Sequence, residues 1–156
     1  MDEKAYLVMA VEQARKTMKE NLGGPFGAAL VDAQGTVYVG SNTVLGSHDP
    51  TSHAEVNVIR QACEANKSHD LTGSILFTTC YPCPMCLGAC IWANIKTVYY
   101  GCTPQDAEAI GFRDDFIYRY IQGGCTDEQI LELLPSDREA CLQLFAEYSA
   151  LQKEIY

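Results

Sequence analysis

Hydrophobic residues near the start of the chain recur with the period of an α-helix. Three or four positions separate Leu7, Val11, Ala14 and Met18, which places them on one face of an amphipathic helix over about residues 4–20. An Asn-Leu-Gly-Gly run follows this face. Asparagine and glycine tolerate the left-handed backbone conformation, so this run is expected to end the helix.

Beyond this helix, short apolar runs alternate with segments of helical period. The apolar runs predict strands at residues 25–31, 36–41, 74–79 and 97–102. Helical spacing predicts helices at residues 53–66 and 83–94. A turn joins the first two strands, and a polar loop over residues 42–52 precedes the first of these helices. A hairpin followed by strands and helices in alternation indicates an α/β sandwich with a mixed sheet.

The last third of the chain has a mainly helical pattern. Helices are expected at about residues 114–121, 127–134 and 137–153. The chain contains 156 residues and no internal repeat or linker, which favours one domain over residues 1–156.

The charge balance narrows the class of partner. Eleven basic and twenty acidic residues give a net charge of −9, whereas a protein that binds a phosphate backbone usually carries a basic stripe. The nearest basic group, Arg15, Lys16 and Lys19, is interpreted as a solvated helix face. We therefore expect a small uncharged substrate and no nucleic acid. The sequence shows no membrane-spanning run and no signal peptide, so a cytoplasmic protein is expected.

Four residues form a pattern suited to a catalytic metal. His53 and Glu55 stand in an H-x-E motif, and Cys83 and Cys86 stand in a P-C-x-x-C motif. One imidazole and two thiolates suit Zn²⁺, and three protein ligands leave a fourth position for water. Glu55 follows the histidine and is a candidate general base. We expect one zinc ion per subunit, held by His53, Cys83 and Cys86.

Six further cysteines need another explanation. Cys80 lies three residues before Cys83 and could be a fourth ligand in a closed structural site. The other cysteines are interpreted as reduced, packed thiols: Cys63, Cys90, Cys102, Cys125 and Cys141.

The two motifs in this order resemble the signature of zinc-dependent base deaminases. Residues 53–56 and 80–88 are similar to the cytidine deaminase superfamily, and within it to the bacterial guanine deaminase group. Residues 23–28, residues 49–51 and Tyr156 extend the similarity to that group, as do residues 111–118. The similarity runs from about residue 20 to 121 and then thins until the last few residues.

This resemblance implies a fold and an activity. The fold is the cytidine-deaminase-like three-layer α/β/α sandwich with a central mixed sheet. The activity is hydrolytic deamination of a free nucleobase, most simply guanine and water to xanthine and ammonia. The resemblance also implies a homodimer in which the C-terminal segment, about residues 122–156, is exchanged between subunits.

Other functions use the same motifs. The substrate could be cytosine, a nucleoside such as guanosine, or an aminotriazine. A tRNA adenosine deaminase shares the motifs, although the acidic charge argues against it. A non-catalytic zinc module is the alternative outside the enzymes, and it would have no use for Glu55.

The resemblance also assigns residues to the substrate: Phe26, Asn42, Ala54, Trp92 and Tyr156. Phe26 and Trp92 would form walls around the ring, and Asn42 would hydrogen-bond the imidazole edge of a purine. Asp114 would contact the exocyclic amine and assist proton transfer. Tyr156 would close the site, in one arrangement from the partner chain.

Local sequence offers a structural role for most of these positions. Phe26 and Trp92 could be core aromatics, and Asn42 could be a turn residue. Asp114 could cap a helix, and Tyr156 could be a frayed terminus.

The sequence departs from the group in two places. Tyr81 stands where related deaminases commonly carry glutamate, and residues 122–150 differ in pattern from the C-terminal region of the group.

Overall fold

The computed structural model describes all 156 residues and divides into two compact units, Met1–Ile117 and Tyr118–Tyr156. The first nine elements lie in the N-terminal unit: α1 (Glu3–Lys19), β1 (Gly27–Val31), β2 (Val37–Ser41), α2 (Val44–Ser47), α3 (Ala54–Asn66), β3 (Ile75–Cys80), α4 (Pro84–Trp92), β4 (Thr97–Cys102) and α5 (Pro104–Ala109). Helix α6 (Asp115–Gln122) begins in this unit and crosses the boundary, and α7 (Arg138–Ala150) lies in the C-terminal unit. No helix is long and apolar enough to cross a membrane.

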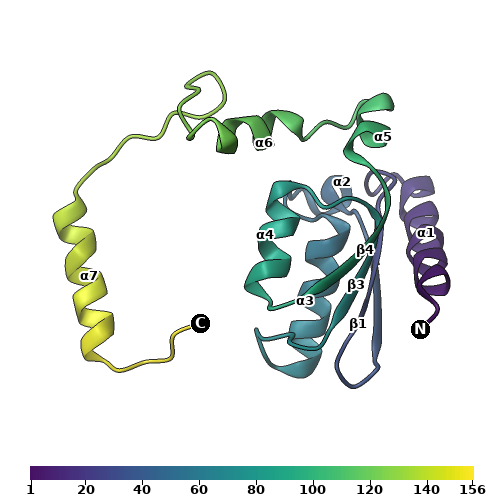
Figure 1. Ribbon diagram of the computed structural model, residues 1–156, viewed down its shortest axis with the longest axis horizontal. Helices are drawn as coiled ribbons and strands as arrows, with labels where there is room; N and C mark the ends of the chain where they lie inside the picture. The colour runs from purple at the N-terminus through teal and green to yellow at the C-terminus, as the bar shows by residue number, and fades with distance from the viewer. The chain divides into compact units, whose positions relative to one another are not determined.

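The N-terminal unit is a three-layer α/β/α sandwich, as the sequence predicts. Its sheet has the order β2-β1-β3-β4, in which β1 is antiparallel to both neighbours and β3 is parallel to β4. Helix α1 lies on one side of the sheet, and α3 and α4 lie on the other (Figure 1). The mixed sheet brings the end of β2 and the end of β3 to positions from which the chain enters α3 and α4.

Two clusters of buried residues hold the layers together. One joins the sheet to α3 and α4 through fully buried Ala54, Val58 and Leu76. The other lies under α1, where Tyr6 stacks on Phe77 with ring centroids 4.8 Å apart. Burial of these side chains on both faces of the sheet supplies the main driving force for folding.

The buried face of α1 differs from the predicted one. Met18 is 42% exposed, whereas Ala10, Ala14 and Thr17 are buried. The Thr17 hydroxyl donates a 2.8 Å hydrogen bond to Ser41 Oγ at the end of β2, so a polar residue satisfies its donor inside the interface. The spacing of apolar residues therefore predicts a buried face that differs by about one position from the one observed at the end of the helix.

In the C-terminal region two of the three predicted helices are confirmed, as α6 and α7. The predicted helix at 127–134 is wrong, because this segment forms only a turn, with Ile130 N bonded to Asp127 O at 3.0 Å. Pro135 follows it, and a residue before proline avoids the helical conformation. The short helices α2 and α5 were not predicted.

Close contact between α1 and β1 makes Gly27 a sensitive position. An added Cβ would lie 2.0 Å from the Ala10 carbonyl oxygen, so α1 would have to move off the sheet. We expect Gly27→Ala to lower the free energy of unfolding by about 1–3 kcal/mol, measured by urea denaturation. Gly88→Ala in α4 is the control: a Cβ there meets nothing within 4 Å, and the better helix former should leave stability unchanged or raise it. Equal losses in the two variants would contradict this account.

Candidate metal and substrate site

The metal-ligand candidates lie at the N-termini of two helices. His53 is the N-cap residue of α3 and Cys83 the N-cap residue of α4, both with extended backbone, and neither side chain caps its own helix. Cys86 lies in the first turn of α4. Pro84 favours this start because its fixed φ suits the first helical position. The imidazole and the thiols are therefore free to face one another.

The three side chains have the geometry of a zinc site. His53 Nδ1 lies 3.4 Å from Cys83 Sγ and 3.5 Å from Cys86 Sγ, and the three ligand atoms lie within 4.8 Å of one another. Tetrahedral zinc with ordinary bond lengths requires nitrogen–sulfur separations of about 3.6 Å. The donor set and its spacing thus fit zinc with three protein ligands.

Cys80 is not part of this group. Its Sγ instead lies 3.7 Å from the Thr103 carbonyl oxygen, to which the thiol donates. Burial raises the pKa of the Cys80 thiol to about 11, which disfavours the thiolate that zinc requires. The closed four-ligand site therefore receives no support from this geometry. Among the remaining cysteines, Cys102 and Cys141 are exposed, so their interpretation as packed thiols is wrong.

The cluster favours an ionised sulfur. A hydrogen bond from the Cys86 thiol, together with His53, lowers the pKa of Cys83 to about 4. The hydrogen bond to Cys83 in turn raises the pKa of His53. The thiolate form is thus favoured at Cys83, whereas the hydrogen bond to Cys83 raises the pKa of Cys86, whose proton zinc would have to displace.

Glu55 lies beside this cluster and is only 6% exposed. Its Oε1 accepts a 2.8 Å hydrogen bond from Thr78 Oγ1, and burial raises the pKa of its carboxyl group. Thr78, itself 1% exposed, was not identified from the sequence. Thr78 lies on β3, five positions before Cys83 in the sequence. Only the packing of α3 on that strand brings it next to Glu55.

A cavity of about 480 Å³ opens above the cluster and the carboxylate. Phe26 lines it and meets Phe112 edge-to-face, with ring centroids 5.1 Å apart. Tyr81 also lines the cavity and packs edge-to-face on Tyr100. Burial raises the pKa of Asp114, another lining residue. The cavity thus combines aromatic walls with a few polar groups, as in sites for small planar molecules.

Asn42 lines the cavity and also holds the local turn. Its Oδ1 accepts hydrogen bonds from Gly24 N at 3.4 Å and Val44 N at 3.1 Å, and its backbone N–H donates to Phe26 O. The carbonyl end of the amide is therefore used by the backbone. The amide Nδ2 is the group that Asn42 can offer to a ligand.

Three predicted substrate residues do not line the cavity. Ala54 is fully buried in the core between His53 and Glu55. Trp92, at the opposite end of α4 from the cysteines, is 74% exposed, so it is neither a cavity wall nor a core aromatic in this chain. Tyr156 belongs to the C-terminal unit and is exposed there. Its role in closing a site stays a prediction.

The cavity also contains residues to which the sequence analysis gave no role at the site. Phe112 and Arg113 come from the segment just before Asp114. Arg113 Nε bonds Asp115 at 3.2 Å, and Glu108 lies 3.7 Å away. The positive charge of Arg113 is thus compensated by acidic side chains within the protein.

Comparison with known proteins identifies the family to which this fold and site belong. A model of the cytidine and deoxycytidylate deaminase zinc-binding region matches residues 1–102, and the chain belongs to this family. Guanine deaminase of Bacillus subtilis (strain 168) is 45% identical over 121 residues, which are 78% of each chain. The X-ray structure of guanine deaminase from Bacillus subtilis superposes with a TM-score of 0.91 at 38% identity, covering 100% of this chain and 99% of that one. A tRNA-specific adenosine deaminase of Haemophilus influenzae is 37% identical over 113 residues, 71% of this chain and 64% of the relative.

The ligand set makes a direct prediction about metal content. Cys86→Ser replaces a buried thiol in the cluster with a poor zinc ligand, so the purified variant should retain little zinc by mass spectrometry. Chelation should lower the melting temperature of the parent protein and leave that of this variant nearly unchanged. Cys80→Ser is the control and should keep its zinc. Loss of zinc from the Cys80 variant alone would show that the ligand set is different.

Proposed function

We propose that this protein is a zinc-dependent hydrolase that deaminates a free nucleobase, with guanine as substrate and xanthine and ammonia as products. One observation carries the chemistry: buried Glu55 lines the same cavity as His53 and Cys83 of the metal cluster. A structural zinc site has no need of a buried acid beside it. The choice of guanine is supported by the similarity to guanine deaminase along most of the chain.

The lining of the cavity favours a small, planar, uncharged ring. Phe26 and Tyr81 offer aromatic surfaces on which a heteroaromatic base can pack. Arg113, which is the only lysine or arginine of the lining, is paired with acidic neighbours and is poorly suited to a phosphate. With a net charge of −9, a tRNA substrate is disfavoured despite the similarity to a tRNA-specific deaminase.

Zinc bound by His53, Cys83 and Cys86 would lower the pKa of water and so supply the nucleophile at neutral pH. Glu55 accepts a proton from the attacking water and delivers it to the ring nitrogen next to the carbon that bears the amine. Thr78 donates to Glu55 Oε1 and so holds the carboxyl group in place for this transfer. The raised pKa of Glu55 suits a group that must both take and return a proton.

Two polar residues would orient the base. Asn42 Nδ2 donates to the imidazole edge of the purine, because its Oδ1 is already bonded to the backbone. Asp114 accepts from the exocyclic amine and helps the departing ammonia gain its proton. Burial raises the pKa of this carboxyl group, which makes it a better proton carrier than an exposed aspartate.

We also propose that residues 1–156 act as one cytoplasmic deaminase domain that forms a homodimer, with residues of about 122–156 exchanged between subunits. Exposed apolar side chains support a partner. In the N-terminal unit Ile91 and Trp92 are more than half exposed, and in the C-terminal unit Leu144 and Phe145 are too. Surfaces of this kind usually mark an interface.

Glu55→Gln tests the proposed chemistry. The amide keeps the size of the side chain and the hydrogen bond from Thr78 but cannot carry the proton, so zinc content and folding should be unchanged. Ammonia release from guanine should fall by about 10²–10⁴-fold or more. Full activity of this variant would remove the acid–base role. If this variant failed to fold and the parent protein showed no measurable activity, a structural zinc module would be favoured instead.

The substrate is tested separately on the zinc-loaded parent protein. Ammonia release should be highest with guanine when guanine, guanosine, cytosine and an aminotriazine are compared. Turnover of another amine in preference to guanine would overturn the substrate while leaving the mechanism intact.

The exchanged dimer is tested by complementation. Glu55→Gln and a chain that lacks Tyr156 should each be inactive, and both are denatured together and refolded with zinc. If Tyr156 completes the site of the partner, the mixed dimer contains one complete site and activity returns. If Tyr156 serves its own chain, the mixture stays as inactive as its components, and if it serves no site, the chain that lacks it is active on its own.

A further inference from the structure

The loop that carries Asn42 into the cavity is held on α3 by a side chain that does not itself line the cavity. This loop, residues 42–52, leads from β2 to His53 and contributes Asn42, Val44, Leu45 and Pro50 to the cavity lining. Its two ends meet where Thr43 N donates to Ser52 O at 3.0 Å. The loop is therefore closed at its base, and its position depends on what holds that base.

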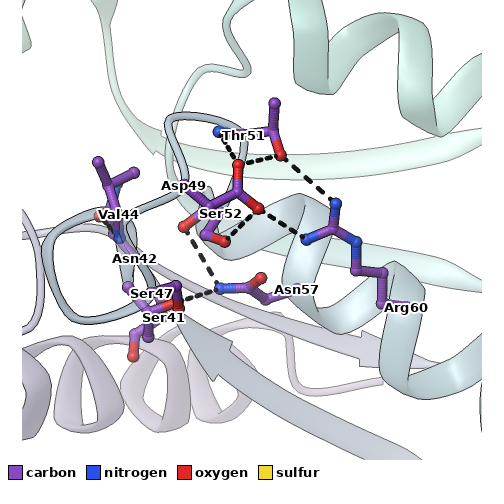
Figure 2. Close-up of polar contacts among 10 residues, drawn as sticks. Ser41, Asn42, Val44, Ser47, Asp49, Thr51, Ser52, Asn57 and Arg60 are labelled. Atoms are coloured by element: carbon purple, nitrogen blue, oxygen red, sulfur yellow. Dashed lines mark hydrogen bonds and ion pairs between the residues drawn. The ribbon is translucent and has the colours of Figure 1, made fainter.

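Asn57, one turn into α3, provides this attachment. Its Nδ2 lies 2.8 Å from Ser41 O, 3.1 Å from Thr43 Oγ1 and 3.3 Å from Ser52 O. Figure 2 shows this amide directed from the helix toward the base of the loop. One amide group thus bonds the strand end that enters the loop and the residue that leaves it.

The contact with Ser41 is the most consequential. Ser41 O belongs to the peptide bond that continues into Asn42, whose own N–H donates to Phe26 O at 2.9 Å. That peptide is therefore fixed from both sides, by α3 and by the segment before β1. The Asn42 side chain leaves the backbone at this fixed point and is then bonded by Gly24 N and Val44 N.

A second set of contacts braces the far end of the loop. Asp49 Oδ1 accepts from Thr51 N at 2.8 Å and from Thr51 Oγ1 at 2.7 Å, and its Oδ2 accepts from Ser52 Oγ. Arg60, also on α3, lies 3.8 Å from Asp49 Oδ2 (Figure 2). These contacts keep the exit turn rigid, but only Asn57 joins both ends of the loop to the helix of His53 and Glu55.

We propose that Asn57 is a positioning residue of the substrate cavity, which sets the place of Asn42 and its loop relative to the metal cluster. This proposal rests on the proposed function insofar as the cavity binds the amine substrate. Because Asn57 acts on the cavity wall and not on the proton-transfer group, its loss weakens substrate binding more than the chemical step.

The decisive variant is Asn57→Asp, which keeps the size of the side chain and replaces a donor with a carboxylate facing three oxygen atoms. The matched control is Gln61→Glu, the same chemical change one turn later on α3, where Gln61 Nε2 donates only to Val39 O on β2. Asn57→Ala removes the donors without adding charge and should shift the same measurements if the aspartate variant folds poorly.

Both Asn57 variants should raise KM for guanine about tenfold and change kcat by less than about threefold, with zinc content unchanged. Gln61→Glu should match the parent protein in all three measurements. A fall in kcat at constant KM, or loss of zinc, would overturn the positioning role.

Amide hydrogen exchange provides a readout that needs no substrate. Residues 42–52 should exchange faster in the Asn57 variants than in the parent protein, while the core of α3 and the Gln61 variant stay protected. Unchanged exchange in the loop would overturn the proposal. If the parent protein does not convert guanine, the substrate assignment fails, and the exchange result still decides the role of Asn57.

Discussion

Close packing of α3 on the sheet is the constraint on which the site depends. Ala54, Val58 and Ala62 repeat every fourth position and are fully buried against the sheet. Their small size lets the helix approach the strands closely. Ala54 lies between His53 and Glu55, so its burial fixes the direction of both neighbours. Resemblance assigns Ala54 to the substrate, which stays a prediction, and its methyl group belongs to the packing interface.

The same packing removes the Glu55 carboxylate from water and brings a hydrogen-bond donor next to it. Glu55 is turned into the interior, where an ionised carboxylate loses its hydration. Thr78 on β3 offsets part of this cost with its 2.8 Å hydrogen bond, and its register partner on β1 is Ala28, which is small. The pKa of Glu55 remains raised because the loss of hydration on burial outweighs the hydrogen bonds that the carboxyl group receives from Thr78, Cys86 and its own backbone. A carboxyl group that protonates readily is what proton transfer between water and amine requires.

Sequence predicts well what depends on neighbours along the chain. The metal-ligand candidates lie at helix starts because short-range spacing and Pro84 determine those starts. Contacts between distant segments are beyond such rules. Thr78 is 23 residues from Glu55, and Phe112 meets Phe26 only after the sheet has formed. Thr17 shows the same limit inside a correctly predicted helix, because its burial depends on Ser41 of another element.

Chemistry and specificity are carried by different kinds of structure in this fold. Groups that would hold zinc and move protons sit at the starts of α3 and α4, where helix packing leaves them little freedom. Groups that would face the ring come from connecting segments, namely Phe26 before β1, Asn42 in the loop and Phe112 before α6. Loops can change without disturbing the core. This separation explains how relatives named for guanine and for tRNA adenosine can both resemble one chain. On the same reasoning, a residue that holds a loop without lining the cavity, as Asn57 does, would act on substrate binding and not on proton transfer.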